Sequence, residues 1–285
     1  MPDLMLPHLA LRPLAEPDLA AAHGLSSAVQ WPHRLEDWRF ALQQGQGVAA
    51  TQQGVVVGTA MTWPFGDQAA GIGLVIVTEA LQGRGLGRKL MREVMALAGE
   101  DRTLMLHATL AGLALYRSLG FVPSFEVRQH QGTCFAVELA PLPAGARLRP
   151  SGRSDLAPLL ALDRAATGFD RATLLTAMVE GAECIVLDQD GTVAGFALRR
   201  RFGRGHVIGP VITPNRATAR AMIAHFLGRS AGQFTRLDVP EDSGLGPWLA
   251  GLGLVEVGRV VRMLRGEAPR GGPPVCFALA SQAFG

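Results

Sequence analysis

The chain has 285 residues, of which 48% are hydrophobic and 18% charged, a composition typical of globular proteins and unlike that of disordered or collagen-like chains. Its 27 basic and 24 acidic residues give a formal net charge of +3, too balanced for a nucleic-acid-binding protein. Three widely spaced cysteines argue against a zinc module or a disulfide framework and favour a reducing compartment. Because neither a signal-peptide pattern nor a membrane-length apolar run is present, we expect a cytoplasmic protein that does not contact membranes.

An internal repeat divides the chain into two halves. Leu11–Pro13, followed by Asp18, recurs later in the chain as Leu148–Pro150, followed by Asp155. Recurrence of the same residues at the same spacing is typical of a duplicated domain. The repeat predicts a first domain at residues 1–140 and a second at 147–285, joined by a proline-containing linker at 141–146.

The spacing of the repeat changes once along the chain. Ser118–Phe121 aligns with Gly251–Leu254. The distance along the chain from the Leu-Arg-Pro motif to this second matched segment is shorter in the second half than in the first. The second half therefore lacks about four residues between the two sets of anchors.

Strands are predicted where short apolar runs lie between glycine and aspartate, and helices where apolar residues recur at helical spacing. In chain order, the first half predicts a strand to residue 12, helices at 17–29 and 35–44, strands at 47–52, 55–63 and 70–77, a helix at 86–97, a strand at 103–107, a helix at 110–119, and strands from residues 121 and 133. The second half repeats this order. A final strand at 274–280 could pair with either half, and the fold class is α/β.

The most informative stretch is a buried strand, Gly73–Val77, that leads into a glycine-rich turn and a helix. Backbone N–H groups converge there with the helix dipole behind them, which is typical of a pyrophosphate site. Gly85 and Gly87 leave room for a phosphate, and Arg84 and Arg88 add positive charge. The spacing excludes a Walker loop and a dinucleotide fingerprint. An ordinary tight turn at a helix N-terminus is the alternative.

At this turn the sequence resembles the GNAT superfamily of N-acetyltransferases, whose signature is Gln/Arg-x-x-Gly-x-Gly/Ala between the fourth strand and the third helix. Gln82, Gly85 and Gly87 occupy its fixed positions, and Leu115–Phe121 is similar to the family's LYxxLGF ending. The resemblance implies two tandem GNAT-like domains, each a central mixed, mostly antiparallel sheet flanked by helices. It also implies acetyl-CoA as co-substrate and no metal.

The resemblance further implies which residues hold the cofactor. The fourth strand would hydrogen-bond the pantetheine, the loop would hold the pyrophosphate, and a residue after the fifth strand would stand in for the family's asparagine. In chain order these residues are Val75, Ile76, Val77, Gln82, Gly83, Arg84, Gly85, Leu86, Gly87, Arg88 and Thr109.

Acetyl transfer requires a neutral amine, a polarised thioester carbonyl and a proton for the departing thiolate. A backbone N–H of Ile76 or Val77 would polarise the carbonyl. Tyr116, the only tyrosine, stands where the family places its general acid, and a partly buried helix aromatic is the alternative. Two residues are candidates for the general base, Glu79 and His107. The alternatives are a solvated loop carboxylate and a hydrogen-bonded strand-end histidine.

The acceptor site is expected near the first two helices and the loop after the third strand. Trp31, His33, Trp38 and Trp63 lie in these segments and predict a partly aromatic pocket, with core packing as the alternative. The acceptor would be a small-molecule amine or the amine of a peptide or protein. The absence of an acidic cluster there argues against a polycationic acceptor.

The second half lacks the chemistry-bearing residues of the first. Its missing residues fall in the phosphate loop, and Leu249 replaces Tyr116, so we expect a degenerate, non-catalytic copy and one acetyl-CoA per chain. The cluster formed by Arg199–Arg201 and Arg204 predicts a solvated hairpin end, with an effector site as the alternative. The chain would act as a monomer or a homodimer. A non-catalytic protein that senses CoA or serves as a scaffold is the competing hypothesis.

Overall fold

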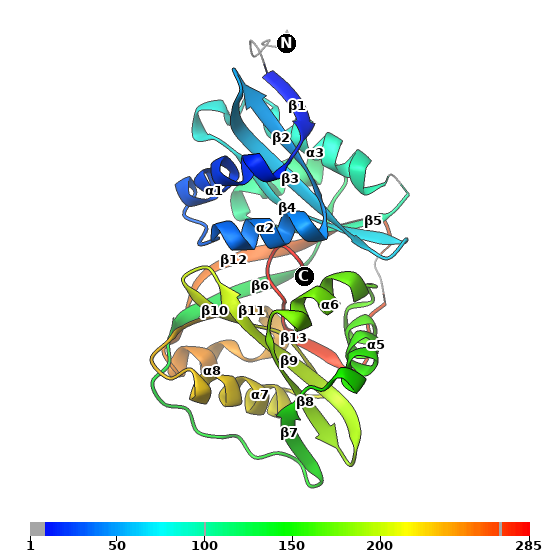
Figure 1. Cartoon of the computed structure of the whole chain (residues 1–285), viewed down its shortest axis with the longest axis vertical. Coiled ribbons are helices and arrows are strands. Elements are labelled where there is room, and N and C mark those ends of the chain that lie inside the picture. Colours follow the sequence, from blue (N-terminus) through cyan, green and yellow to red (C-terminus); the bar gives the residue numbers. More distant parts are fainter. Residues whose placement is uncertain (1–8, 100, 268–269) are drawn as a thin grey trace.

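A computed structural model of the chain describes residues 9–99, 101–267 and 270–285 (Figure 1). The first half contains β1 (Leu9–Pro13), α1 (Leu19–Ala28), α2 (Leu35–Gln44), β2 (Gln46–Gln52), β3 (Val55–Phe65), β4 (Ala69–Val77), α3 (Leu86–Ala98), β5 (Thr103–Ala108), α4 (Leu113–Ser118) and β6 (Val122–Thr133). The second half contains β7 (Ala146–Pro150), α5 (Leu156–Thr167), α6 (Ala172–Glu180), β8 (Glu183–Gln189), β9 (Thr192–Phe202), β10 (Gly205–Thr213), α7 (Arg216–Arg229), β11 (Phe234–Pro240), α8 (Gly246–Gly251), β12 (Leu254–Arg265) and β13 (Val275–Ala278).

The two halves share one 13-stranded sheet. Along the sheet the strand order is β1-β2-β3-β4-β5-β12-β6-β11-β10-β9-β8-β7, with β13 against β10. Most neighbours are antiparallel, while β4 with β5 and β10 with β11 are parallel. The mixed, mostly antiparallel sheet flanked by helices is thus confirmed, but the sheets of the two halves are continuous.

The halves exchange their last long strands. In the first half, β5 pairs with β12, which belongs to the second half. In the second half, β11 pairs with β6, which belongs to the first. Figure 1 shows β6 and β12 side by side at the middle of the molecule. Each half therefore completes its sheet with a strand from the other.

A pseudo-twofold axis passes between the exchanged strands. Val127 of β6 pairs with Val260 of β12, and the alignment of Ser118–Phe121 with Gly251–Leu254 makes these two valines repeat equivalents. A residue that faces its own repeat equivalent is the signature of an isologous contact. The chain therefore resembles a symmetric dimer whose two subunits have been joined into one polypeptide.

Helices cover the sheet in three groups. The apolar faces of α3 and α4 pack on the first half's strands, and those of α7 and α8 pack on the second half's strands. The third core is shared, because α1 and α2 of the first half meet α5 and α6 of the second around the aromatic residues Trp38, Trp63, Phe169 and Phe284. Burial of these side chains joins the halves through hydrophobic contact.

The pairing of the strands decides two predictions, one at the end of each half. The strand expected from residue 133 is wrong, because β6 ends at Thr133 and residues 134–143 form no strand. Cys134 instead turns into the core beneath α7 and α8, and both edges of β6 are already occupied. The final strand, which could have paired with either half, pairs as β13 with β10 of the second half.

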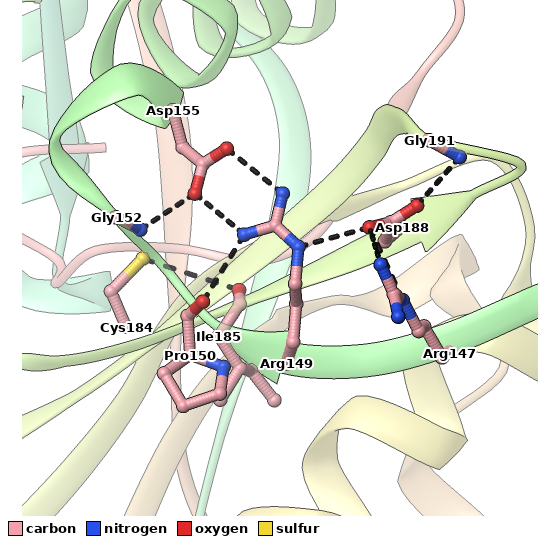
Figure 2. A network of polar contacts seen from close by, with 9 residues as sticks. All are labelled: Arg147, Arg149, Pro150, Gly152, Asp155, Cys184, Ile185, Asp188 and Gly191. Carbon is pink, nitrogen blue, oxygen red and sulfur yellow. Dashed lines mark hydrogen bonds and ion pairs between the residues drawn. The ribbon is translucent and has the colours of Figure 1, made fainter.

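The repeated Leu-Arg-Pro motif marks an ion pair that ties each half's first strand to its first helix. In the first half Arg12 donates to both carboxylate oxygens of Asp18 at 2.6 and 2.7 Å. In the second half Arg149 donates to Asp155 at 2.7 and 3.0 Å and also to Asp188 at 2.9 Å (Figure 2). Such bidentate contacts are stronger than ordinary hydrogen bonds.

We expect Arg149→Met to lower the melting temperature at pH 7, because Asp155 and Asp188 lose their shared guanidinium. Hydrogen bonds from Arg149 and then Arg147 lower the pKa of Asp188 from 3.8 to about 2. A carboxylate whose pKa is lower in the folded state stabilises the fold above its unfolded pKa and loses that effect as pH falls through the folded pKa. The gap in melting temperature from the wild type should therefore narrow between pH 4 and pH 2.

The matched control is Arg147→Met, because the Arg147 side chain is 72% exposed and, among the described residues, bonds through its side chain only to Asp188. We expect it to lower the melting temperature less. Equal losses for the two variants, or a gap that does not change with pH, would contradict the role given to Arg149.

Candidate functional site

Strands β4 and β5 separate at the centre of the first half. Their parallel pairing ends at Ile72 and Leu106, although β4 continues to Val77 and β5 to Ala108. The edge of β4 that faces β5 is therefore unpaired from residue 73 to residue 77. An unpaired strand edge offers backbone donors and acceptors to a ligand that lies along it.

A β-bulge causes this separation. The register between β3 and β4 shifts between Thr59 and Met61, and Leu74 adopts a left-handed φ of 50°, which is strained for a branched side chain. The Thr59 hydroxyl donates to the Leu74 carbonyl at 2.8 Å and holds the bulge. A bulge that bends the strand away from its neighbour is a common device next to active sites.

The turn after β4 forms an open backbone cradle. Gly83 and Gly85 have φ values of 72° and 81°, and a Cβ at either residue would meet nothing within 4 Å. Gln82 Nε2 donates to the Val77 carbonyl at 3.0 Å and fastens the loop to the strand. Among the described residues, the N–H groups from residue 83 to residue 88 have no acceptor, and α3 begins at Leu86. These free donors at a helix N-terminus favour an anion.

The corresponding helix of the second half is closed. The Asn215 side chain accepts from the Thr218 N–H at 3.0 Å and caps α7, so fewer free donors remain there. Leu249, the counterpart of Tyr116, is fully buried in α8. The open backbone cradle and the phenol thus occur only in the first half, within the described chain.

The second half also fills its own strand gap. Strand β13 pairs antiparallel with β10, and the Leu279 N–H donates to the Asp238 carbonyl of β11 at 2.8 Å. The segment from residue 275 to residue 279 therefore lies between β10 and β11, the pair that corresponds to β4 and β5. Polypeptide occupies the place that is open in the first half.

Tyr116 lies in α4, on the face of the sheet covered by α3, and only 9% of it is exposed. Its ring meets that of Phe121 edge-on at a centroid distance of 6.2 Å. Burial raises the pKa of Tyr116 to about 12, so the hydroxyl keeps its proton at neutral pH. Its hydroxyl has no hydrogen-bond partner among the described residues, which leaves the donor free for a ligand.

His107 contacts the C-terminal segment. Its Nδ1 lies 2.9 Å from the Gln282 carbonyl, and because a carbonyl only accepts, Nδ1 carries the proton. Nε2 is buried and has no partner among the described residues. Burial, followed by the charge of Arg262, lowers the pKa of His107 to about 3, so the ring is neutral at pH 7.

A cavity of about 430 Å³ opens at the bulge and lies between the two halves. We call it the interhalf cavity. The first half supplies the α1–α2 loop, the bulge and the end of β5, the exchanged strands form its floor, and the second half and the C-terminal segment close it. Its lining includes Val29–His33, Gly73, Leu74, His107, Thr109, Gln129, Gln131, Phe202, Arg204, Arg236, Val257–Val260 and Ser281–Ala283.

The four aromatic residues expected at the acceptor site divide between cavity and core. Trp31 and His33 line the interhalf cavity, and burial lowers the pKa of His33 to about 4. Trp38 and Trp63 are fully buried, and their indole N–H groups donate to Ser26 Oγ at 3.0 Å and to the Ala41 carbonyl at 2.9 Å. For this pair, core packing is the observed role.

The arginine cluster of β9 is not a solvated hairpin end throughout. Arg199 is buried and pairs with Glu183, and Arg200 donates to the Ala280 carbonyl at 3.0 Å. Consecutive residues of a strand point to opposite faces of the sheet, so Arg199 and Arg200 of β9 are covered on different faces. Of the four arginines in this cluster, Arg204 is the one that is both exposed and part of the lining of the interhalf cavity.

Sequence reasoning missed the residues that the second half brings to the cavity. Arg236 is held by Asp238 at 2.9 Å and lies over the Phe202 ring at 5.5 Å. Gln282 donates to Asp238 at 3.0 Å. No local pattern could have found them, because only the strand exchange brings these residues to the first half.

The two candidate bases are not brought together. His107 lines the interhalf cavity, whereas Glu79 is exposed on the short turn before the cradle and does not line it. Thr109 also lines the cavity, beside His107 at the end of β5. In the described chain, no group of three or more His, Cys, Asp or Glu side chains is placed to hold a metal ion. No described helix is long and apolar enough to cross a membrane.

Comparison with known families gives the same result for both halves. Residues 13–121 match the model of the acetyltransferase (GNAT) family, and residues 159–273 match that of the acetyltransferase (GNAT) domain. The chain belongs to the GNAT acetyltransferases. It contains two GNAT domains in tandem and is an acyltransferase of a family that uses acetyl-CoA as co-substrate and amines as acceptors.

Relatives of the whole chain are similar in length. An uncharacterized N-acetyltransferase of Bacillus subtilis (strain 168), YitH, is 29% identical over 216 residues, which cover 74% of this chain and 75% of that protein. A putative acetyltransferase from Pyrococcus horikoshii has a TM-score of 0.80 at 20% identity, over 100% of this chain and 99% of that one. A tandem GNAT protein from the clavulanic acid biosynthesis pathway has a TM-score of 0.64 at 18% identity, over 93% and 100%. The two structural likenesses show a shared fold.

We expect Gly85→Glu to abolish acetyl-CoA binding without unfolding the GNAT chain. The carboxylate would enter open space where the cradle favours an anion, and its repulsion of the pyrophosphate at short range should remove measurable binding. Isothermal titration with acetyl-CoA measures the affinity, and circular dichroism checks the fold.

The matched control is Gly85→Gln, which has the same shape and the same backbone strain at a φ of 81° but no charge. We expect it to bind more tightly than Gly85→Glu. Equal affinity of Gly85→Glu and the wild type for acetyl-CoA would show that the cofactor does not bind at this turn.

Proposed function

We propose that the first half transfers the acetyl group of acetyl-CoA to an amine bound in the interhalf cavity, by direct attack in a ternary complex. The observation that carries the proposal is that the unpaired edge of β4 and the interhalf cavity meet at the bulge. Gly73 and Leu74 line the cavity, and the unpaired edge of β4 starts at the same bulge. A thioester at the bulge would face an amine across a short distance, which is the condition for direct transfer.

The unpaired edge of β4 and the cradle are suited to different parts of the cofactor. Backbone groups from Val75 to Val77 would bond the pantetheine, and an N–H of Ile76 or Val77 would polarise the thioester carbonyl. The turn from Gln82 to Arg88 would hold the pyrophosphate, since its N–H groups are free and Arg84 is exposed. Thr109 would contact the cofactor from the end of β5, although a hydroxyl replaces only part of an asparagine.

Tyr116 would protonate the departing thiolate. A phenol with a pKa of about 12 remains protonated throughout the neutral range, so it is always present as a donor. A thiolate that forms beside it in the same buried surroundings also loses solvation, which raises its basicity toward that of the phenolate and allows the proton to be transferred.

The interhalf cavity would itself favour the reactive form of the amine. Arg204, Arg236 and Arg259 line it, while no carboxylate does so among the described residues. Nearby positive charge lowers the pKa of a bound ammonium, so the amine would bind in its neutral, nucleophilic form. The same charges disfavour polycationic acceptors and suit an amine whose remaining groups are neutral or anionic.

His107 is the better placed of the two base candidates, because it lines the cavity and Glu79 does not. With a pKa of about 3 it is a weak base, and its Nε2 is covered. Its contribution would be to position the C-terminal segment and to relay a proton when the acceptor opens a path to it.

The second half would serve the first without catalysing transfer. We propose residues 1–140 as the catalytic unit, 141–146 as the linker and 147–285 as a degenerate GNAT unit. Its capped helix, its Leu249 and its filled strand gap support this division of roles. It supplies β12 to the first half's sheet and the guanidinium groups of Arg204 and Arg236 to the cavity.

We expect the wild type to release CoA in the presence of amines and Tyr116→Phe to turn over about 10² to 10⁴ times more slowly, the usual contribution of general acid catalysis. Acetyl-CoA affinity should stay within a few-fold, because the hydroxyl has no hydrogen-bond partner among the described residues that the substitution would disturb. A panel of small amines with thiol detection measures turnover, and titration calorimetry measures affinity. The wild-type rate should not fall between pH 7 and pH 10, since the phenol stays protonated.

Other outcomes decide between the proposal and a CoA-sensing or scaffold protein. Tight acetyl-CoA binding with no thiol release from any amine would favour the sensor. An unchanged turnover rate in Tyr116→Phe would show that the tyrosine packs in the core and is not the general acid.

A further inference from the structure

A second cavity, of about 590 Å³, lies mainly in the second half, with Met105, His107 and Phe125 of the first half completing its lining. It is the repeat counterpart of the interhalf cavity. Ala166, Thr167 and Phe169 border it, and the repeat aligns them with the α1–α2 loop that borders the first cavity. Pro240 and Asp242 border it as well, and their repeat equivalents are His107 and Thr109 of the first cavity. The duplication therefore retained a ligand-sized space in the half that lost its phosphate cradle.

This second cavity cannot receive an acetyl group from its own half. The gap between β10 and β11, through which a thioester would reach it, contains residues 275–279. Val275, Phe277 and Leu279 from that segment form part of the cavity wall. The space is thus open and walled largely by apolar side chains, and His107 borders both this cavity and the interhalf cavity.

One guanidinium in the second cavity has no counter-charge. Arg262 lies between two rings, 5.0 Å from the Phe125 centroid and 5.3 Å from that of Phe169. Among the described residues it makes no hydrogen bond or ion pair, and burial, helped by Arg171, lowers its pKa to about 10. Arg262 is half-buried, and a charge that is partly removed from water without a partner is costly. Its repeat equivalent in the first half is the neutral Gln129.

The neighbouring groups do not neutralise Arg262. Arg171 is already paired with Asp163 at 2.6 Å and with the Phe284 carbonyl at 2.9 Å. Burial raises the pKa of Cys276 to about 11, so the thiol is uncharged at pH 7. Asp242, the carboxylate in the described lining, is exposed and forms no ion pair with Arg262. The site lacks one negative charge.

We propose that the second cavity binds a small carboxylate with an apolar body, whose anionic group pairs with Arg262. A planar guanidinium matches a carboxylate with two parallel hydrogen bonds. Met105, Phe277 and Leu279 would enclose the apolar part, and the volume lies in the range of small-molecule sites. A single unpaired cation suits a monoanion better than a phosphate, which carries more charge.

The test is calorimetric titration of the full chain with 3-phenylpropionate and with 3-phenylpropan-1-ol, in the presence of saturating acetyl-CoA. We expect one equivalent of the acid to bind, and the alcohol to bind about tenfold more weakly or worse, since a charge-assisted hydrogen bond contributes at least that much. Arg262→Met should weaken the acid about tenfold and leave the alcohol unchanged. Arg204→Met, which removes a cation from the interhalf cavity instead, should leave both affinities unchanged.

Stability gives a second readout. Because Arg262 has no partner, Arg262→Met should keep or raise the melting temperature of the unliganded protein, and 3-phenylpropionate should raise that of the wild type only. Equal binding of acid and alcohol, loss of acid binding in Arg204→Met, or a lower melting temperature in Arg262→Met would overturn the proposal. So would the absence of binding by 3-phenylpropionate, benzoate and octanoate at millimolar concentration.

Discussion

The exchange of β6 and β12 is the constraint on which the rest of the structure depends. Hydrogen bonds between β5 and β12 and between β11 and β6 make each half's sheet incomplete without the other. A chain ending after Pro143 would leave β5 with an open edge and β6 without either partner strand. Exposed strand edges of this kind promote aggregation, so we infer that the two halves fold as one unit.

The same exchange creates the interhalf cavity. It also allows the two copies of the repeat to differ in role. It brings Arg204, Arg236 and Gln282 to the end of β5, where the first half alone has only its bulge and helix loop. The pseudo-twofold axis at Val127 and Val260 would give two equal sites. Strand β13 breaks that symmetry by filling one strand gap, while the other stays open for a cofactor.

Much of the fold could be predicted from the sequence because its signals are local. The repeat of Leu11–Pro13 at Leu148–Pro150 identified two related halves, and the structure shows the arginine–aspartate pairs that the motif encodes. The glycine-rich turn was found because the backbone conformation at Gly85 requires glycine. In the first half, apolar periodicity located the strands and helices up to β6 to within a few residues, whereas the strand expected from residue 133 is wrong.

The exchange and the residues it positions could not be predicted in this way. The mixed polar and apolar residues of β6 carry no signal for the half with which it pairs, and only packing of the whole chain decides this. For the same reason Trp38 and Trp63 gave the same aromatic signal as Trp31 but lie in the core. Arg236 and Arg262 lie on strands that carry no local motif, and their roles depend on neighbours that are distant in the sequence.

The most direct test of this account is a crystal structure of the full chain with acetyl-CoA. We expect one cofactor molecule per chain, with its pyrophosphate at Gly85 and its thioester between β4 and β5. Residues 275–279 should remain between β10 and β11. A cofactor found between β10 and β11, with β13 displaced, would contradict the account.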